Sequence, residues 1–418
     1  MGWEIRMQKN FQKTIYLLGK TGIFLVALFA VITFEQAIPD KMYVPVGEKA
    51  SYQFGVPVSV VLKQEQAEVF EHISKTVSQV KNENPAHYTV TCKLFGIVPV
   101  KDVEVTLVDD QMVYTGGSPI GIYVETQGVM VIGTGEINTS DGIAQNPSKH
   151  LVKEGDYILA VNGRKVNSKE ELIQRINECG EDKETLDVLR NGETIQVEVE
   201  PVRVSENAYM LGIWVRDDLA GVGTLTYAKE SGEYAALGHG VSDADTGLLM
   251  DIEDGWIYKT NIVGIKKGKN GTPGELSGVI DYASSARLGT VSKNEKIGIH
   301  GVLEKDITTL GESQYMEVGY KQEISYGKAY VISGITGENK SYEIEIEKID
   351  YSENEENKGI MFEVTDPALL ELTGGIVQGM FTSYNGNNTR KSSKIKGLRC
   401  SSPISLTKKR LVFCARYN

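Results

Sequence analysis

The longest run of apolar residues lies near the amino terminus of the chain. Every residue from 23 to 32 is apolar, and an apolar segment at residues 15–18 extends the run backwards past Gly19 and Lys20. About 20 such residues cross a bilayer as a helix. We therefore expect a transmembrane anchor at residues 15–35.

Basic residues precede this run and set its expected orientation. Arg6, Lys9 and Lys13 lie in residues 1–14, which the positive-inside rule places in the cytoplasm. The rest of the chain would then be exported. A cleaved signal peptide is the alternative, but no small-x-small cleavage site follows the run.

Residues 36–105 carry weaker patterns, and we interpret them as a membrane-proximal stalk. Apolar residues recur at helical spacing in residues 65–80. Residues 89–107 alternate in places between apolar and polar positions, which is typical of strands.

Residues 106–203 give the clearest pattern of strands and turns. Apolar positions predict strands at residues 106–113 and 120–132. Asn-Gly pairs at 162–163 and 191–192 predict two hairpins, because both residues tolerate the positive φ of the tight turn.

A single amphipathic helix is expected inside this unit. Ser168 followed by Glu171 is a capping box that opens it, and Gly180 is a suitable residue to end it. The apolar face of this helix would consist of Leu172, Ile173, Ile176 and Cys179.

Residues 204–380 contain short apolar runs separated by glycines and turn signals, without long amphipathic helices. This pattern favours an all-β barrel or sandwich. The fold class expected for the whole chain is therefore mainly β with some α.

Composition and charge narrow the functional classes. With 41% hydrophobic and 24% charged residues among 418, the composition is that of an ordinary globular protein. The net charge of −12 argues against nucleic acid as a partner. Four cysteines are too few for a disulfide scaffold in a chain of this length.

The charge is unevenly distributed along the chain. Residues 381–418 carry nine Lys and Arg residues and no Asp or Glu, so the first 380 residues have a net charge of −21. A basic tail is the simple interpretation of this break. A frameshift or a small deletion after Met380, which would make the tail aberrant, is the other.

Two segments of residues 106–203 resemble a bacterial PDZ domain. They are Gly-Ser-Pro-Ile-Gly-Ile at 117–122 and Leu-Val-Lys-Glu-Gly-Asp-Tyr-Ile-Leu-Ala-Val-Asn-Gly at 151–163. The resemblance implies that the first segment holds a peptide carboxylate and that the peptide adds a strand beside it. A glycine-containing turn without a ligand is the alternative. The implied peptide-binding residues are Ser118, Pro119, Ile120, Gly121 and Ile122.

One of the five histidines has the surroundings of a catalytic base. His239 lies between Gly238 and Gly240, so the backbone can turn sharply and leave the imidazole accessible. Histidine is the usual general base near neutral pH. Asp243 and Asp245 follow, which leaves a divalent-metal loop and a solvated turn as alternatives, although no further acidic residue stands at calcium-loop spacing.

A glycine-rich segment at residues 364–380 has the composition that a nucleophile and its oxyanion hole need. Small residues allow backbone N–H groups to converge on a developing oxyanion. A glycine-rich turn between barrel strands is the alternative.

Together these segments resemble the stage IV sporulation protein B family, which are membrane-anchored serine peptidases of endospore-forming bacteria. The resemblance rests on the order of anchor, PDZ domain and peptidase domain. It also rests on Leu-Gly-His at 237–239, on Gly-Thr-Pro-Gly-Glu at 271–275 and on residues 365–380.

This resemblance implies a fold and a set of site residues. Residues 204–380 would form a trypsin-like double barrel. His239 would be the catalytic base, Asp366 would complete the triad, and backbone N–H groups near Gly379 would form the oxyanion hole.

The chain departs from the family at the nucleophile. After Met380 the family continues with Ser-Gly-Ser-Pro and uses the first serine, whereas this chain has Phe381. A phenylalanine cannot attack a carbonyl. Ser383 falls at the second family serine and is the remaining candidate nucleophile.

Two functions stay open on these residues. The resemblance implies an exported serine endopeptidase in sporulation, whose substrate is a membrane-bound regulator of a site-2-type protease that activates a late sigma factor. In the alternative, the chain is an inactive protein whose PDZ domain binds a partner's peptide. We expect no cofactor and no metal for either, and the resemblance places the exported part at the forespore membrane, facing the intermembrane space.

Overall fold

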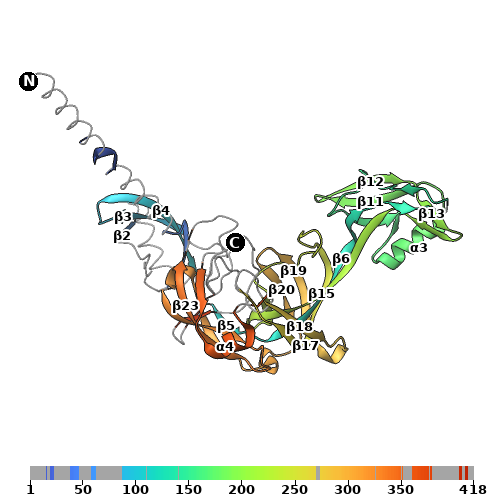
Figure 1. The fold of residues 1–418 in the computed structure, drawn as a ribbon. Helices are drawn as coiled ribbons and strands as arrows, with labels where there is room; N and C mark the ends of the chain where they lie inside the picture. Colours follow the sequence, from blue (N-terminus) through green and yellow to red (C-terminus); the bar gives the residue numbers. More distant parts are fainter. Residues whose placement is uncertain are drawn as a thin grey trace, which may run out of the picture.

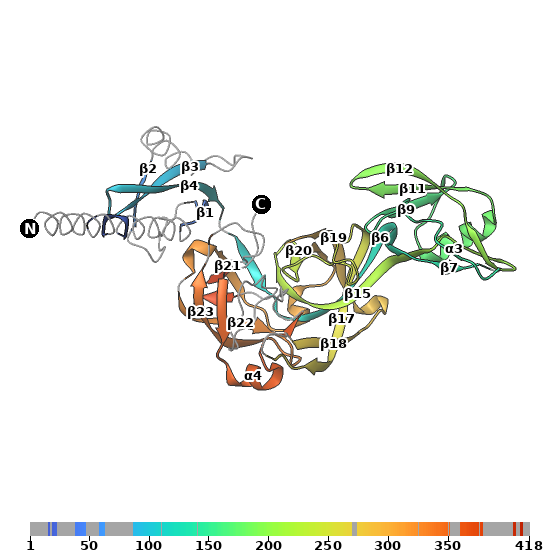
Figure 2. The same ribbon diagram turned by 45° about the horizontal axis from the view of Figure 1, so that its top comes forward.

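The computed structural model describes most of the chain between residues 38 and 378, with gaps, and two short pieces beyond. The described residues are 16, 19–22, 38–46, 58–62, 87–109, 111–139, 141–269, 274–324, 326–349, 351, 360–375, 377–378, 404–406 and 410–412. They form an elongated molecule with a small sheet at one end, a PDZ-like unit at the other, and barrel strands between (Figure 1, Figure 2).

Two of the predicted helices fall in parts that are not described. Almost all of the expected anchor at residues 15–35 lies outside the described residues, as does the helix expected at residues 65–80. Among the residues that the structure does describe, no helix has the length and apolar character needed to cross a membrane.

A four-stranded sheet precedes the barrel, with the strand order β1-β4-β3-β2. The strands are β1 (Lys41–Pro45), β2 (Val58–Leu62), β3 (His87–Leu94) and β4 (Val98–Val108). Alternate residues such as Val90 and Val103 are buried in a core of this sheet alone. Tyr43 stacks on Tyr320 with ring centroids 5.8 Å apart. The described part of the expected stalk is therefore a folded sheet that contacts the barrel region.

Two long antiparallel strands run from the barrel into the PDZ-like unit (Figure 1). They are β6 (Pro119–Thr134) and β15 (Ile213–Ala228). Their pairing extends from Pro119 opposite Thr224 to Thr134 opposite Ile213, with two shifts of register. Each strand therefore belongs to two folded units at once.

The two halves of β6 have different neighbours. Residues 120–126 pair with β17 (Ile252–Lys266) on the side opposite β15. Val129 and Met130 pair instead with β9 (Tyr157–Val161) of the PDZ-like unit. We call residues 129–216 the inserted unit, because the chain leaves the barrel along β6 and returns to it along β15.

This arrangement differs from the linear order that the sequence indicates, with a PDZ unit at 106–203 followed by a barrel from residue 204. β5 (Met112–Thr115) pairs with β15, and the first half of β6 lies between β15 and β17. Residues 112–126 are thus barrel strands that precede the inserted unit. Local apolar alternation reveals a strand but not which partner strand it joins.

The inserted unit contains short strands and both of the predicted hairpins. Asn162 and Gly163 have φ of 50° and 71°, and Asn191 and Gly192 have φ of 51° and 82°. These values are those of a tight hairpin turn, so the Asn-Gly predictions are confirmed. Its further strands are β7 (Ile137–Asn138), β8 (Ala144–Gln145), β10 (Arg164–Lys165), β11 (Glu184–Arg190), β12 (Glu193–Val199), β13 (Val202–Ser205) and β14 (Ala208–Met210).

The predicted helix is α3 (Lys169–Cys179). The Ser168 hydroxyl accepts a hydrogen bond from Glu171 N at 3.2 Å and caps the first turn. Leu172 and Ile176 are buried, whereas Ile173, which the sequence predicts for the same apolar face, is 54% exposed. The buried stripe is therefore narrower than the apolar pattern indicates.

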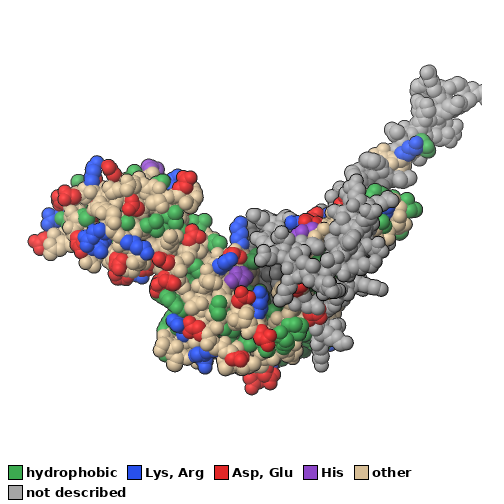
Figure 3. Space-filling view, turned by 180° about the vertical axis from the view of Figure 1, so that it is seen from behind, with side chains coloured by type: hydrophobic (Ala, Val, Ile, Leu, Met, Phe, Trp, Pro, Cys, Tyr) green, Lys and Arg blue, Asp and Glu red, His purple; other side chains and the backbone are tan. Residues whose placement is uncertain are grey.

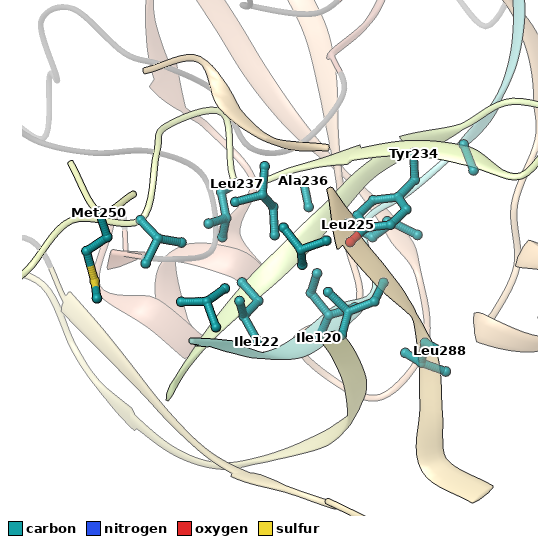
Figure 4. Packing of buried hydrophobic residues seen from close by; sticks show 14 of the residues in the cluster. Ile120, Ile122, Leu225, Tyr234, Ala236, Leu237, Met250 and Leu288 are labelled. Atoms are coloured by element: carbon teal, nitrogen blue, oxygen red, sulfur yellow. The ribbon is translucent and has the colours of Figure 1, made fainter. Parts of the chain in front are cut away.

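The first barrel core lies between β6 and β15 and the strands that follow them in the chain. Ile120, Ile122, Leu225, Tyr234 and Leu288 are buried together there, and Figure 4 shows them around one interior. The remaining strands are β16 (Glu233–Ala236), β18 (Gly274–Ile280), β19 (Arg287–Glu295) and β20 (Gly298–Leu303). Short 3-10 helices occupy Ser284–Ala286, Ile307–Leu310 and Lys321–Glu323.

A second core lies further along the chain. Its buried residues include Val331, Ile344, Phe362 and Leu369, and Leu276 from β18 packs against it. The two cores therefore approach each other at β18. The elements here are β21 (Tyr315–Gly319), β22 (Gly327–Ser333), β23 (Lys340–Ile349), β24 (Ile360–Val364), α4 (Pro367–Thr373) and β25 (Val377–Gln378).

Two pieces of the basic tail join this second region. β26 (Ile404–Leu406) pairs with β22, and β27 (Arg410–Val412) pairs with β21. If residues 381–418 were aberrant, as the frameshift interpretation holds, strand edges of this region would stay unpaired. In the structure these two described pieces cover strand edges instead.

We predict that Gly128→Ala destabilises the protein, because Gly128 sits where β6 changes partners. Its φ is +73°, and an added Cβ would lie 2.4 Å from the Ile158 carbonyl oxygen. The expected loss is about 2 kcal/mol of unfolding free energy, measured by urea denaturation. Gly133→Ala in the same strand is the control, since nothing lies within 4 Å of its added Cβ. Equal stability of the two variants would contradict this account of the junction.

Candidate functional site

A strained turn presents His239 at the end of β16. Leu237 and Gly238 have φ of 74° and 68°, and Leu237 N donates a hydrogen bond to Thr224 O at 3.1 Å. A positive φ is unusual for a leucine and costs free energy that the surrounding structure must supply. The sharp turn that the flanking glycines predict is therefore present, and it begins one residue earlier.

Gly240, on the other side of His239, is required by close packing. An added Cβ would lie 2.2 Å from Leu249 Cδ1 and 2.6 Å from the Glu295 carbonyl oxygen. The chain after His239 is thus pressed against β19. Any side chain at this position would force Leu249 or the backbone at Glu295 to shift.

The loop that follows His239 is held from β19 by one amide side chain. Asn294 Oδ1 accepts a hydrogen bond from Val241 N at 2.7 Å. Its Nδ2 donates to Val241 O and to Met250 O, both at 2.8 Å. Asn294 thus ties the two ends of the loop together.

The two aspartates of this loop pair with an arginine from β15. Arg216 Nε lies 2.6 Å from Asp243 Oδ2, and Arg216 Nη2 donates to Asp245 Oδ2 at 2.6 Å. Asp243 Oδ1 accepts hydrogen bonds from Asp245 N, Thr246 N and the Thr246 hydroxyl. Both carboxylates therefore have partners within the loop and on β15, which gives each of them a structural role.

Burial and these partners shift the pKa of the Asp243 carboxyl group in opposite directions. Burial alone would raise the pKa of its carboxyl group. The hydrogen bonds from Thr246 and Asp245 and the charge of Arg216 outweigh burial, and the pKa lies below its ordinary value. Asp243 is therefore an ionised, structural carboxylate.

The inserted unit contacts the far end of the same loop. The Tyr157 hydroxyl accepts a hydrogen bond from Asp251 N at 2.8 Å, and Gln127 N donates to Asp251 O at 3.3 Å. An added Cβ at Gly155 would lie 2.7 Å from Leu248 Cδ1, so the two surfaces are in close contact. The His239 loop is therefore enclosed by β15, β19 and the inserted unit.

His239 faces a cavity of about 290 Å³. Its Nδ1 lies 2.9 Å from Gly240 O. In the tautomer in which Nδ1 carries the proton, this contact is a hydrogen bond and Nε2 is the basic nitrogen. The cavity is lined by Ile122, Leu219, Gly221, Val222, Leu237, His239, Gly240, Val241, Ser242, Glu275 and Leu276.

A short strand, β25, lies next to β18, which contributes Glu275 and Leu276 to the cavity lining. β25 pairs in parallel with β18, with Val377 opposite Gly274 and Gln378 opposite Glu275. Glu275 also lines the cavity. Gly379, Phe381 and Ser383 follow β25 in the sequence and are outside the described residues.

Asp366 is not joined to His239. Its Oδ1 accepts hydrogen bonds from Ala368 N at 2.9 Å and Leu369 N at 3.1 Å, so it is the N-cap of α4. Its Oδ2 accepts from Glu343 N at 3.4 Å. The structure thus gives Asp366 a capping role, and none of the described cavity residues is Asp366.

The predicted peptide-binding loop is part of the barrel. The Ser118 hydroxyl donates to Leu310 O at 2.8 Å, and Pro119 lies opposite Thr224. Ile120, Gly121 and Ile122 pair with β15 on one side and with β17 on the other. A peptide cannot add a strand here, because both edges are already occupied. The expectation that residues 118–122 hold a peptide is therefore corrected by the pairing.

Three of the other histidines have local surroundings that fit structural roles. His87 Nδ1 lies 2.9 Å from the Thr106 hydroxyl, and His150 is exposed. Burial lowers the pKa of His300, which favours its neutral form. His72 lies outside the described residues.

These features define a β-barrel protein with a PDZ-like insertion and a cavity beside His239. Residues 207–388 match the family described as SpoIVB peptidase S55, and residues 120–200 match the PDZ domain family. The chain therefore carries a SpoIVB-type peptidase domain together with a PDZ domain. The peptidase match begins at residue 207, near the end of the inserted unit, and leaves out β5 and the first half of β6, which belong to the same barrel.

Other comparisons add little. No curated protein matches the chain. Among solved structures, the chain is similar to the PDZ domain of the SdrC-like protein from Listeria monocytogenes, with 19% sequence identity, 21% of this chain and 87% of that chain covered, and a TM-score of 0.17.

We predict that Arg216→Gln destabilises the protein, because it leaves the buried Asp243 carboxylate without its cation. The expected loss at neutral pH is about 2 kcal/mol, less than for a fully buried pair because Arg216 is 29% exposed. A carboxyl group whose pKa is lowered by folding stabilises the fold above its unfolded pKa. The difference in unfolding free energy between the native protein and Arg216→Gln should therefore shrink as the pH falls below about 4.

The measurement is urea denaturation of both proteins between pH 3 and pH 7. Arg287→Gln is the matched control, since it breaks the half-exposed pair with Glu304 and should cost at most about 0.5 kcal/mol. If Arg216→Gln loses no more unfolding free energy at pH 7 than this control does, the arginine does not stabilise the loop.

Proposed function

We propose that the chain derives from a sporulation serine endopeptidase that is anchored in the forespore membrane and acts in the intermembrane space. Its substrate would be a membrane-bound regulator of a site-2-type protease in late sigma-factor activation. The observation that carries the peptidase part is the pairing of β25 with β18, which brings the segment before residue 381 beside the His239 cavity.

In this proposal His239 is the general base. Its Nε2 takes the proton of the nucleophile, and the contact of Nδ1 with Gly240 O fixes the ring and its tautomer. Backbone N–H groups near Gly379 would stabilise the oxyanion. Asp366 acts through α4, because its cap holds the helix that leads through Gly374 into β25.

We also propose that this chain is inactive as it stands, because Phe381 replaces the serine that the family uses. Ser383 is two residues further on, where its direction relative to His239 would differ. A peptidase that uses Ser383 is the weaker alternative, since the backbone N–H groups would have to be rearranged around it.

The second candidate function is an inactive protein that binds peptides through its PDZ domain. A peptidase domain and a PDZ domain both indicate a protein or peptide partner. On the face shown in Figure 3, acidic and basic side chains are interspersed over the barrel and the inserted unit, so the face is not dominated by one sign of charge. The occupied edges of residues 120–122 weigh against this function at the groove that the resemblance implies.

A serine-directed fluorophosphonate probe tests the peptidase proposal without knowledge of the substrate. The native chain should not be labelled, because an unactivated serine reacts too slowly. The triple variant Phe381→Ser, Thr382→Gly and Tyr384→Pro restores Ser-Gly-Ser-Pro and should be labelled at residue 381. His239→Gln in that background is the control and should abolish labelling.

The outcomes separate the hypotheses. Labelling of the native chain at Ser383 would mean that the chain is active by the alternative serine. Labelling of the triple variant that persists in His239→Gln would contradict the role of His239 as the base. An unlabelled triple variant with native thermal stability would remove the support for a peptidase site at this position.

A further inference from the structure

The cavity beside His239 is lined mainly by aliphatic side chains. They come from β6, β15, β18 and the His239 turn, namely Ile122, Leu219, Val222, Leu237, Val241 and Leu276. An apolar cavity of about 150 Å³ is large enough to hold a benzene molecule. At about 290 Å³, this one has room for a large apolar side chain.

Charged groups are few on this lining. Of the described residues that line the cavity, only His239 and Glu275 are titratable. Glu275 Oε2 lies 3.1 Å from Lys266 Nζ, so its charge is already paired. A charged side chain that entered the cavity would lose water there, and the one carboxylate on the lining is already shared with Lys266.

Gly221 keeps part of this space open. An added Cβ there would meet only Leu219 Cδ2, at 4.0 Å, and the backbone of Gly221 does not have the positive φ that would demand glycine. Neither the backbone conformation nor close packing around the Cβ therefore explains why residue 221 is a glycine. Its position on the cavity lining explains it, because a larger side chain would project into the cavity.

We propose that this cavity is a substrate subsite that takes an apolar side chain of an extended peptide, next to the bond under attack. The proposal rests on the proposed peptidase function, because the cavity is lined by His239 and by β18, the strand with which β25 pairs. An apolar side chain gains free energy by leaving water for such a lining, whereas an acidic or a basic one does not. The subsite therefore selects substrates by the side chain beside the scissile bond.

The experiment measures binding rather than cleavage. The probes are N-acetyl-leucine amide, N-acetyl-glutamate amide and N-acetyl-lysine amide, titrated at equal ionic strength into the full chain. The readout is the imidazole NMR signal of His239 in protein labelled at histidine Cε1, assigned by its loss in His239→Gln. The leucine probe should shift this signal saturably, and the two charged probes should bind at least about tenfold more weakly.

Two glycine variants provide the structural test. Gly221→Leu fills the cavity and should abolish the response to the leucine probe, while Gly221→Ala should weaken it without loss of folding. Gly133→Leu is the matched control, because its added Cβ meets nothing within 4 Å and lies outside the cavity. It should respond as the native chain does.

Equal responses to the three probes would overturn the subsite, and so would an undiminished response in a folded Gly221→Leu. Neither result depends on a serine, so the subsite can fail while fluorophosphonate labelling of the restored variant succeeds. Conversely, selective binding of the leucine probe would still support the subsite if the restored Ser-Gly-Ser-Pro variant were not labelled. The failure of the subsite and the failure of the peptidase proposal are thereby distinguishable.

Discussion

The continuous pairing of β6 with β15 is the constraint on which the rest of the structure depends. One half of this two-stranded ribbon closes the first barrel, and the other half supplies strands to the inserted unit. Because backbone hydrogen bonds of one ladder must stay in register, neither unit can shift along the ribbon alone. With β15 on one side and β17 on the other, both edges of residues 120–125 are occupied, which removes them from peptide binding.

The ribbon also explains how the His239 loop is held. Arg216 projects from β15 onto Asp243 and Asp245, and Tyr157 of the inserted unit receives the Asp251 amide. The loop therefore has contacts with the barrel, the ribbon and the inserted unit. A movement of the inserted unit would act on the histidine turn directly, since no flexible linker separates them.

Local chemistry was predictable from the sequence, whereas long-range partners were not. The Asn-Gly hairpins, the Ser168 cap and the turn at His239 follow from rules that span a few residues, and the structure has all three. The insertion at residues 129–216 depends on which strands pair, and apolar alternation does not encode that. Arg216 and Asn294 were missed for the same reason, because they reach the loop from strands distant in sequence. The available signal was an arginine in a strand that leads toward the His239 loop, together with two aspartates of that loop that had no assigned partner.

Amide hydrogen exchange at residues 120–124 tests the central claim most directly. Those amides lie in a strand paired on both sides, so they should exchange slowly and at the same rate with or without added peptides that carry a free carboxyl terminus. Rapid exchange in the free protein, slowed by such a peptide, would contradict the account. It would return these residues to an open PDZ groove and separate the inserted unit from the barrel.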